Sequence, residues 1–205
     1  MQPSNQLHPK LNSSFIHVEV QDPALKAWGA EAKALLVKWY PKIEDLLGVP
    51  ENPHPAPVYL VIDTHGSGIA GTANRRIEVN GDYVRKFPKD IGLVVHELTH
   101  VVQAYRGSGP GWLTEGIADW VRWFHYEPPS KRPHPNPSKV DYHHGYQDAA
   151  SFLYWAAHRY NLNLVKILNE SMTLDTYTPE VWVYGTGHRL STVWQAYLDH
   201  LKSSS

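Results

Sequence analysis

Residues 94–102 read Val94-Val95-His96-Glu97-Leu98-Thr99-His100-Val101-Val102, and this stretch decides the fold. An α-helix has 3.6 residues per turn, so His96 and His100 fall one turn apart on the same face. Both imidazoles can then reach a single zinc ion, while Glu97, rotated by about 100°, lies beside the metal rather than on it. The other residues are mostly apolar, which predicts a buried helix. Two histidines and a glutamate in a buried helix need a partner, and a metal ion supplies one.

A third ligand is expected on the next helix, which begins near residue 111 after a Gly/Pro turn. Zinc in a catalytic site takes three protein ligands and leaves one position for water, and Glu115 is the predicted third ligand. Asp119, one turn later, is predicted to accept a hydrogen bond from the outer nitrogen of a zinc-bound histidine. The reverse assignment stays open, with Asp119 as ligand and Glu115 as a charge favoured by the helix dipole. The three-histidine pattern of metzincins fails, because Arg106 stands where the third histidine would be.

Two segments resemble a known family. They read His96-Glu97-Leu98-Thr99-His100-Val101-Val102-Gln103 and Gly109-Pro110-Gly111-Trp112-Leu113-Thr114-Glu115-Gly116-Ile117-Ala118-Asp119-Trp120-Val121-Arg122. Both are similar to the plant-type basic secretory protein family, which are zinc-dependent peptidases of plants, fungi and bacteria. Similar segments at residues 70–79, 145–155 and 187–197 extend the likeness over most of the chain. Glu115 with Asp119 is more distantly similar to the carboxylate pair of thermolysin-like enzymes.

The resemblance implies an α+β, zincin-like fold, in which a small twisted mixed sheet packs on the H-E-x-x-H helix and the C-terminal half is mainly helical. A flexible tail is expected at residues 1–13 and a single peptidase domain at residues 14–202. Its upper part would hold the sheet and helices to about residue 105, and its lower helical part would begin at about residue 112. A chain of 205 residues with 42 % hydrophobic content is long enough for one sizeable core.

The strand before the zinc helix of zincins commonly forms a rim on which substrate pairs as an added strand. The resemblance therefore implies that Ala70, Gly71 and Thr72 line this rim, where small side chains let a peptide backbone approach. An ordinary edge strand bent at the glycine is the alternative.

Tyr146 is the candidate for stabilising the oxyanion of the tetrahedral intermediate, since peptidases of this kind use a Tyr, His or Arg donor. In aminopeptidase N relatives a tyrosine in a similar context has that role, although the match here is loose. Packing in the core is the alternative for Tyr146. Tyr142, His143, His144 and His188 are weaker candidates. The pair His143 and His144 could form a second metal site, but adjacent loop histidines are more often solvated.

The predicted function is hydrolysis of peptide bonds by a water that one Zn²⁺ ion activates, with Glu97 as general base. Two alternatives stay open. One is a binding module for glycans or peptides, in which zinc is structural and the eight Trp and twelve Tyr line a groove. The other is a metallohydrolase that acts on something other than peptides. A structural zinc site usually has four protein ligands and has no need of Glu97, which favours the peptidase.

The predicted partner is a peptide or protein substrate, which follows from the predicted peptidase reaction. The formal net charge is −1 and the pI is about 6.9, so nothing favours nucleic acid or an anionic membrane. This near-neutral charge departs from the family's "basic" character. The chain has no cysteine, no apolar run long enough to span a membrane, and no signal peptide at residues 1–5. Secretion is implied by the resemblance alone, and a monomer is expected.

Local patterns predict the elements that surround this site. Pro41 is expected to end or kink the first helix, which would begin at Asp22-Pro23 and be followed by a further turn that stops at Gly48. The zinc helix is expected from Pro88 to about Tyr105. The other expected elements are strands at 15–20, 58–62 and 69–80 (the last with a turn at 74–76), linkers or loops at 50–57 and 63–68, a Pro-rich loop without regular structure at 127–138, and helices at 146–160, 162–172 and 187–201.

Overall fold

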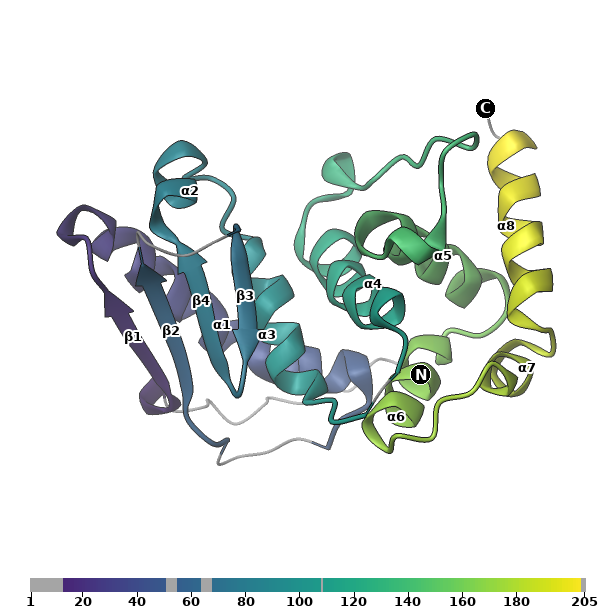
Figure 1. Cartoon of the computed structure of the whole chain (residues 1–205), viewed down its shortest axis with the longest axis horizontal. Coiled ribbons are helices and arrows are strands. Elements are labelled where there is room, and N and C mark those ends of the chain that lie inside the picture. The colour runs from purple at the N-terminus through teal and green to yellow at the C-terminus, as the bar shows by residue number, and fades with distance from the viewer. Residues whose placement is uncertain (1–12, 51–54, 64–67, 108, 204–205) are drawn as a thin grey trace, which may run out of the picture.

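The computed structural model describes residues 13–50, 55–63, 68–107 and 109–203. Eight α-helices and one four-stranded mixed sheet lie within these residues, so the α+β class is confirmed (Figure 1). The strands are β1 (Ile16–Val20), β2 (Val58–Asp63), β3 (Ala70–Ala73) and β4 (Arg76–Asn80). The helices are α1 (Lys26–Leu47), α2 (Gly81–Lys86), α3 (Leu93–Gln103), α4 (Gly111–Val121), α5 (Tyr146–Arg159), α6 (Leu164–Thr173), α7 (Glu180–Thr186) and α8 (Leu190–Ser203). The tail predicted at residues 1–13 lies outside the described residues except for its last residue.

The sheet has the strand order β1-β2-β4-β3. β1, β2 and β4 are parallel, and β3 pairs antiparallel with β4 at the free edge. β2 lies between β1 and β4, as its run of apolar residues predicted. Leu60 and Ile77 are fully buried, so one face of the sheet packs on the core. The opposite face is mixed, because Tyr59 is 46 % exposed and Val61 is buried.

A two-residue turn joins β3 to β4 at the predicted position. Asn74 and Arg75 both have positive φ, 48° and 62°, which is the backbone geometry that matches the twist of a tight β-hairpin. The Arg75 guanidinium donates hydrogen bonds to the carbonyl oxygens of Pro57 (3.1 Å) and Ala56 (2.7 Å). These bonds tie the hairpin to the segment that enters β2.

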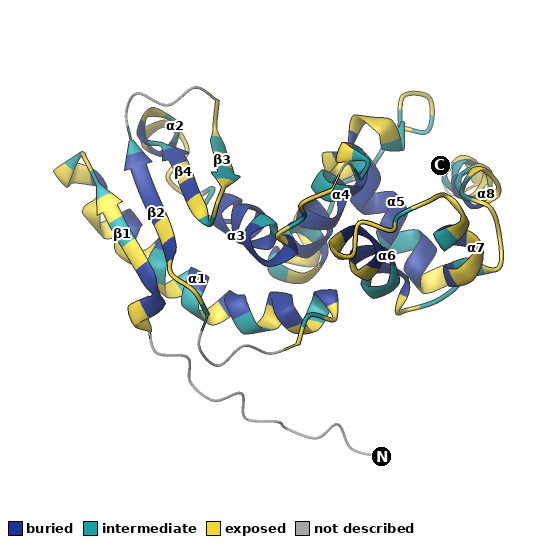
Figure 2. Cartoon of the chain, turned by 60° about the horizontal axis from the view of Figure 1, so that its bottom comes forward, coloured by how far each residue is buried: buried dark blue, intermediate teal, exposed yellow. Residues whose placement is uncertain are grey.

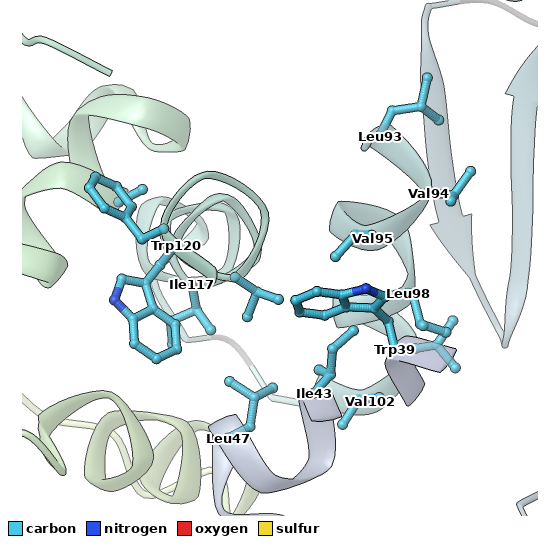
Figure 3. Packing of buried hydrophobic residues seen from close by; sticks show 14 of the residues in the cluster. Trp39, Ile43, Leu47, Leu93, Val94, Val95, Leu98, Val102, Ile117 and Trp120 are labelled. Atoms are coloured by element: carbon cyan, nitrogen blue, oxygen red, sulfur yellow. The ribbon is translucent and has the colours of Figure 1, made fainter. Parts of the chain in front are cut away.

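Helix α3 is the element that both halves of the chain share. On one side it packs on β3, β4 and α1, and on the other side it packs on α4. Figure 3 shows Trp39 and Ile43 of α1, Leu98 of α3 and Ile117 of α4 within one packed cluster. Burying a large aliphatic side chain of this kind contributes about 1.5–3 kcal/mol. After residue 110 the described residues contain helices and no strand, so the mainly helical C-terminal half is confirmed.

Gly116 lets α4 lie close to α5 in that half. A Cβ atom on Gly116 would stand 2.6 Å from the Cβ atom of Ala149, which is closer than real contacts allow. Both helices are largely buried where they meet, whereas much of α7 and α8 faces solvent (Figure 2). None of the helices in the described residues is long and apolar enough to cross a membrane.

Pro41 was expected to end or kink the first helix, and the structure shows that the helix does not end there. α1 runs through Pro41 to Leu47 and stops at Gly48, whose left-handed φ of 70° is the predicted helix end. A proline inside a helix costs about 3 kcal/mol. The buried neighbours Trp39, Tyr40 and Ile43 each contribute about 1.5–3 kcal/mol and outweigh that cost.

Helix α3, which carries His96 and His100, is shorter than predicted, because it begins at Leu93 rather than Pro88 and ends at Gln103. The extra helix α2 precedes it, and the Asn80 side chain caps α2 by accepting hydrogen bonds from two backbone N–H groups. The Pro-rich loop at 127–138 also contains regular structure, a 3₁₀ turn over Pro129–Lys131, since a proline suits the first position of such a turn. The other short helical segments are Ser13–Phe15, Pro23–Leu25, the π-helical Arg122–Tyr126 and Tyr142–His144.

Candidate metal centre

Three side chains from α3 and α4 converge on one point. His96 and His100 lie one turn apart on α3, and Glu115 lies in the second turn of α4, which packs against α3. The His96 and His100 Nε2 atoms are 3.1 Å apart. The Glu115 Oε2 atom lies 3.2 Å from His96 Nε2 and 3.5 Å from His100 Nε2. In the described part of the chain these are the residues grouped closely enough to hold a metal ion.

The outer nitrogens of both imidazoles are already bonded. Asp119 Oδ1 lies 2.7 Å from His96 Nδ1, and Gln103 Oε1 lies 2.8 Å from His100 Nδ1. The amide nitrogen of Gln103 donates to the Thr114 carbonyl oxygen (3.1 Å), so its oxygen is the atom that faces His100. Carboxylate and amide oxygens accept hydrogen bonds, and therefore both Nδ1 atoms carry the proton and both Nε2 atoms are left as ligands.

This arrangement fits a tetrahedral metal ion. Donor atoms about 2.0–2.1 Å from a tetrahedral zinc stand roughly 3.3 Å from one another, and the three observed spacings lie on either side of that value. Two imidazole lone pairs and a carboxylate oxygen at such distances repel unless a positive charge lies among them. A metal ion supplies that charge, and so does a proton on His96 Nε2.

Glu97 lies next to this group and does not belong to it. The Thr72 hydroxyl on β3 donates a 2.7 Å hydrogen bond to Glu97 Oε2. Glu97 is 7 % exposed and lines the same cavity as the three ligand candidates. A carboxylate in this position can exchange a proton with a molecule in the cavity.

Tyr146 begins α5 with a left-handed φ of 43°, which is uncommon for a tyrosine. Its ring stacks against that of His96 at a centroid distance of 6.1 Å, and its side chain is not buried, since the residue is 55 % exposed. The core-packing alternative for Tyr146 is therefore wrong. The charge of Glu115 and partial burial raise the pKa of Tyr146, which keeps its hydroxyl protonated and able to donate.

A cavity of about 730 Å³ connects these groups. The main site residues predicted from the sequence all line it: Ala70, Gly71, Thr72, His96, Glu97, His100, Glu115, Asp119 and Tyr146. A model of the family described as peptidase of plants and bacteria matches residues 24–197, which include all of them. The chain belongs to this family. It is the basic secretory protein family that the sequence resembles, and it places the chain among the peptidases. Comparisons with curated proteins and with solved structures find no match.

Burial and polar contacts have opposite effects on two pKa values in the candidate metal group, which is His96, His100 and Glu115. Burial lowers the pKa of His96, but the bonds to Asp119 and Glu115 outweigh burial and raise this pKa to about 9. Burial raises the pKa of Glu115, but the bonds to His100 and His96 lower it to about 2. The group therefore takes up a positive charge readily, as a site for a cation should.

The weaker sequence candidates do not join this group. His143 pairs with Asp141 (2.7 Å) and His144 with Asp148 (3.1 Å), so each histidine has its own aspartate and, among the described residues, the two form no three-ligand cluster. His144 lines the cavity. The other three candidates, Tyr142, His143 and His188, lie outside its lining, and Tyr142 and His188 pack against other aromatic rings.

Sequence reasoning missed two contacts. It gave Gln103 no role, although a residue three positions after His100 lies on the same helix face, and this spacing was a usable signal. It also assigned Thr72 to substrate binding alone, whereas its hydroxyl bonds Glu97. The cavity lining further includes Leu93, Arg122 and Trp123, for which the sequence carried no signal.

Proposed function

We propose that the chain is a zinc-dependent peptidase of the zincin type, with His96, His100 and Glu115 as the metal ligands. The observation that carries this proposal is the convergence of three ligand atoms at 3.1–3.5 Å, with both outer imidazole nitrogens already bonded. Asp119 contacts the outer nitrogen of His96, which supports Glu115 rather than Asp119 as the third ligand.

Zinc at this point would polarise the scissile carbonyl and lower the pKa of a water toward about 7. Glu97 takes the proton of the attacking water and later returns it to the leaving amine. The Tyr146 hydroxyl donates to the oxyanion of the tetrahedral intermediate. Asp119 and Gln103 hold the two imidazoles in the orientation and tautomer that metal binding requires. The free edge of β3 receives the substrate backbone as an added strand.

Among the described residues, no fourth protein ligand closes the metal group. An open position is typical of catalytic zinc and supports the peptidase over a binding module with structural zinc. The family's secretory designation supports an extracellular location, and the proposed partner is a peptide or protein substrate.

Replacing Glu97 by Gln tests the proposed reaction. The amide cannot accept the proton of the attacking water, so hydrolysis of casein should fall by about 10² to 10⁴ while the zinc content stays at the wild-type level. Unchanged hydrolysis by Glu97→Gln would remove Glu97 from the mechanism. Wild-type protein that holds zinc and cleaves no peptide would favour the binding module.

A further inference from the structure

The contact between Thr72 and Glu97 joins the substrate edge of the sheet to the proposed general base. Thr72 Oγ1 lies 2.7 Å from Glu97 Oε2 and 3.2 Å from the Glu97 carbonyl oxygen. The shorter distance and the negative charge make the carboxylate the stronger acceptor. Among the described residues, Thr72 supplies the hydrogen bond that this carboxylate receives. One oxygen of Glu97 is thus held, and the other is left for proton transfer.

The backbone of Thr72 belongs to the free edge of the sheet. β3 is the outer strand, and the Asn80 N–H donates to the Ile69 carbonyl oxygen (2.9 Å), which fixes the hydrogen-bonding register of the β3–β4 pair. Residues of an antiparallel strand alternate between groups that face the partner strand and groups that face away from it. Ile69 and Gly71 therefore face β4, and the backbone groups of Ala70 and Thr72 lie at the free edge.

The side chains on β3 alternate in the same way. Ala70 and Thr72 are partly buried, whereas Gly71 and Ala73 are exposed, and β3 packs on α3. Thr72 therefore presents its hydroxyl to Glu97 on α3 and its peptide groups to the edge where a substrate strand would pair. Valine would fill the same space and suit a strand equally well, so packing alone does not require the hydroxyl.

We propose that Thr72 is a positioning residue that couples the two events: its backbone binds the substrate strand, and its hydroxyl holds Glu97 in the orientation for proton transfer. This inference rests on the proposed peptidase function. The two roles of Thr72 should therefore affect different kinetic constants. The hydroxyl contributes to kcat, and the backbone contributes to KM.

Thr72→Val and Thr72→Ser test this division. Valine keeps the backbone and the shape but leaves Glu97 Oε2 without its donor, so kcat should fall about tenfold to a hundredfold. KM should stay within about twofold of wild type, and serine should restore most of kcat because it returns the hydroxyl. In metal-free protein, a substrate-like peptide should bind wild type and Thr72→Val with the same Kd.

Thr99→Val is the matched control, because it removes another threonine hydroxyl from the same region. Thr99 Oγ1 donates its hydrogen bond to the Val95 carbonyl oxygen one turn earlier on α3 (2.8 Å) and not to Glu97. Its kcat and KM should match wild type. Zinc content and thermal unfolding are measured on all the variants, so that a loss of the fold is seen as such.

Several results would overturn the proposed role of Thr72. Wild-type kcat in Thr72→Val, or a loss carried by KM, would overturn the proposal. A Thr72→Ser variant as slow as Thr72→Val would do the same. Loss of zinc or of the folded state in Thr72→Val would show a structural role and also overturn it. Failure of the peptidase function itself is distinguishable, because wild type would then cleave no substrate.

Discussion

His96 sets the protonation of the metal group. Its pKa is raised to about 9 from the ordinary 6.5, because the bonds to Asp119 and Glu115 outweigh burial. In the metal-free protein, this pKa predicts a second proton on the His96 imidazole, and thus a positive charge, at neutral pH. Because the raised pKa belongs to the folded state, the stability that it contributes is complete below pH 6.5 and is lost as the pH rises through about 9.

Zinc binding should displace this proton. Titration calorimetry at pH 7.5 in buffers of different ionisation enthalpy should show the release of about one proton per zinc ion. The apparent affinity should rise about tenfold per pH unit up to pH 9. The Asp119→Ala variant should release fewer protons on binding zinc, because the substitution removes one cause of the raised pKa of His96. Zinc binding that is independent of both buffer and pH would contradict this account of His96.

Gln103 should affect metal affinity through His100. Replacing Gln103 by Met keeps a similar length but removes the acceptor for His100 Nδ1–H, so zinc affinity should weaken about 10- to 100-fold. Gln103→Glu keeps an acceptor for His100 Nδ1–H and should lose much less zinc affinity. The exposed Gln195→Met is the matched control for the chemical change. Competition with a chelator of known affinity measures the zinc affinity of all three variants. Equal zinc affinity in Gln103→Met and wild type would refute the role of Gln103.

The helix period was enough to predict that His96 and His100 lie together, because residues four apart share one face. It could not predict the bond between Thr72 and Glu97, which are 25 positions apart. That contact depends on how β3 lies on α3, and a tertiary arrangement of this kind leaves no local pattern. The bond to Gln103 was within reach of the same periodicity, since it is a contact between residues three positions apart.

Gly116 determines how closely α4, which carries Glu115, approaches α5. Gly116→Ala brings a Cβ atom to 2.6 Å from that of Ala149, so it should destabilise the protein by about 1–3 kcal/mol relative to the same change at Gly111. Gly111 begins the same helix and has open space around its Cβ position, so Gly111→Ala serves as the control. Urea unfolding measures the difference, and equal stability of the two variants would show that the α4–α5 contact tolerates a methyl group.

The positions of most elements could be predicted, but several of their limits could not. Alternating and apolar runs predicted the strands, and Gly48 predicted the end of α1. Proline rules predicted an end or a kink at Pro41 and a helix start at Pro88, but α1 does not end at Pro41 and α3 begins only at Leu93. At Pro41, burial on both sides of the proline outweighs its local cost. The cap that begins α2 depends on hydrogen bonds that the Asn80 side chain accepts from the backbone, which the sequence pattern did not mark.

At the scale of the whole molecule, the candidate site residues lie where the sheet half and the helical half meet. The sheet with α1 and α3 supplies Thr72, Glu97 and both histidines, and the helical half supplies Glu115 through α4 and Tyr146 through α5. A metal ion held by His96, His100 and Glu115 would therefore join α3 to α4. Bound zinc should raise the unfolding temperature, since a ligand that binds only the folded state stabilises it.

The central claim is that His96, His100 and Glu115 together hold one zinc ion. Its most direct test is the number of zinc ions bound per chain, and their affinity, in metal-stripped wild type, Glu115→Ala and Asp119→Ala. Wild type should bind one ion, Glu115→Ala should lose tight binding, and Asp119→Ala should bind about 10- to 100-fold more weakly. Zinc binding that is unchanged in Glu115→Ala, or absent from wild type, would contradict the claim.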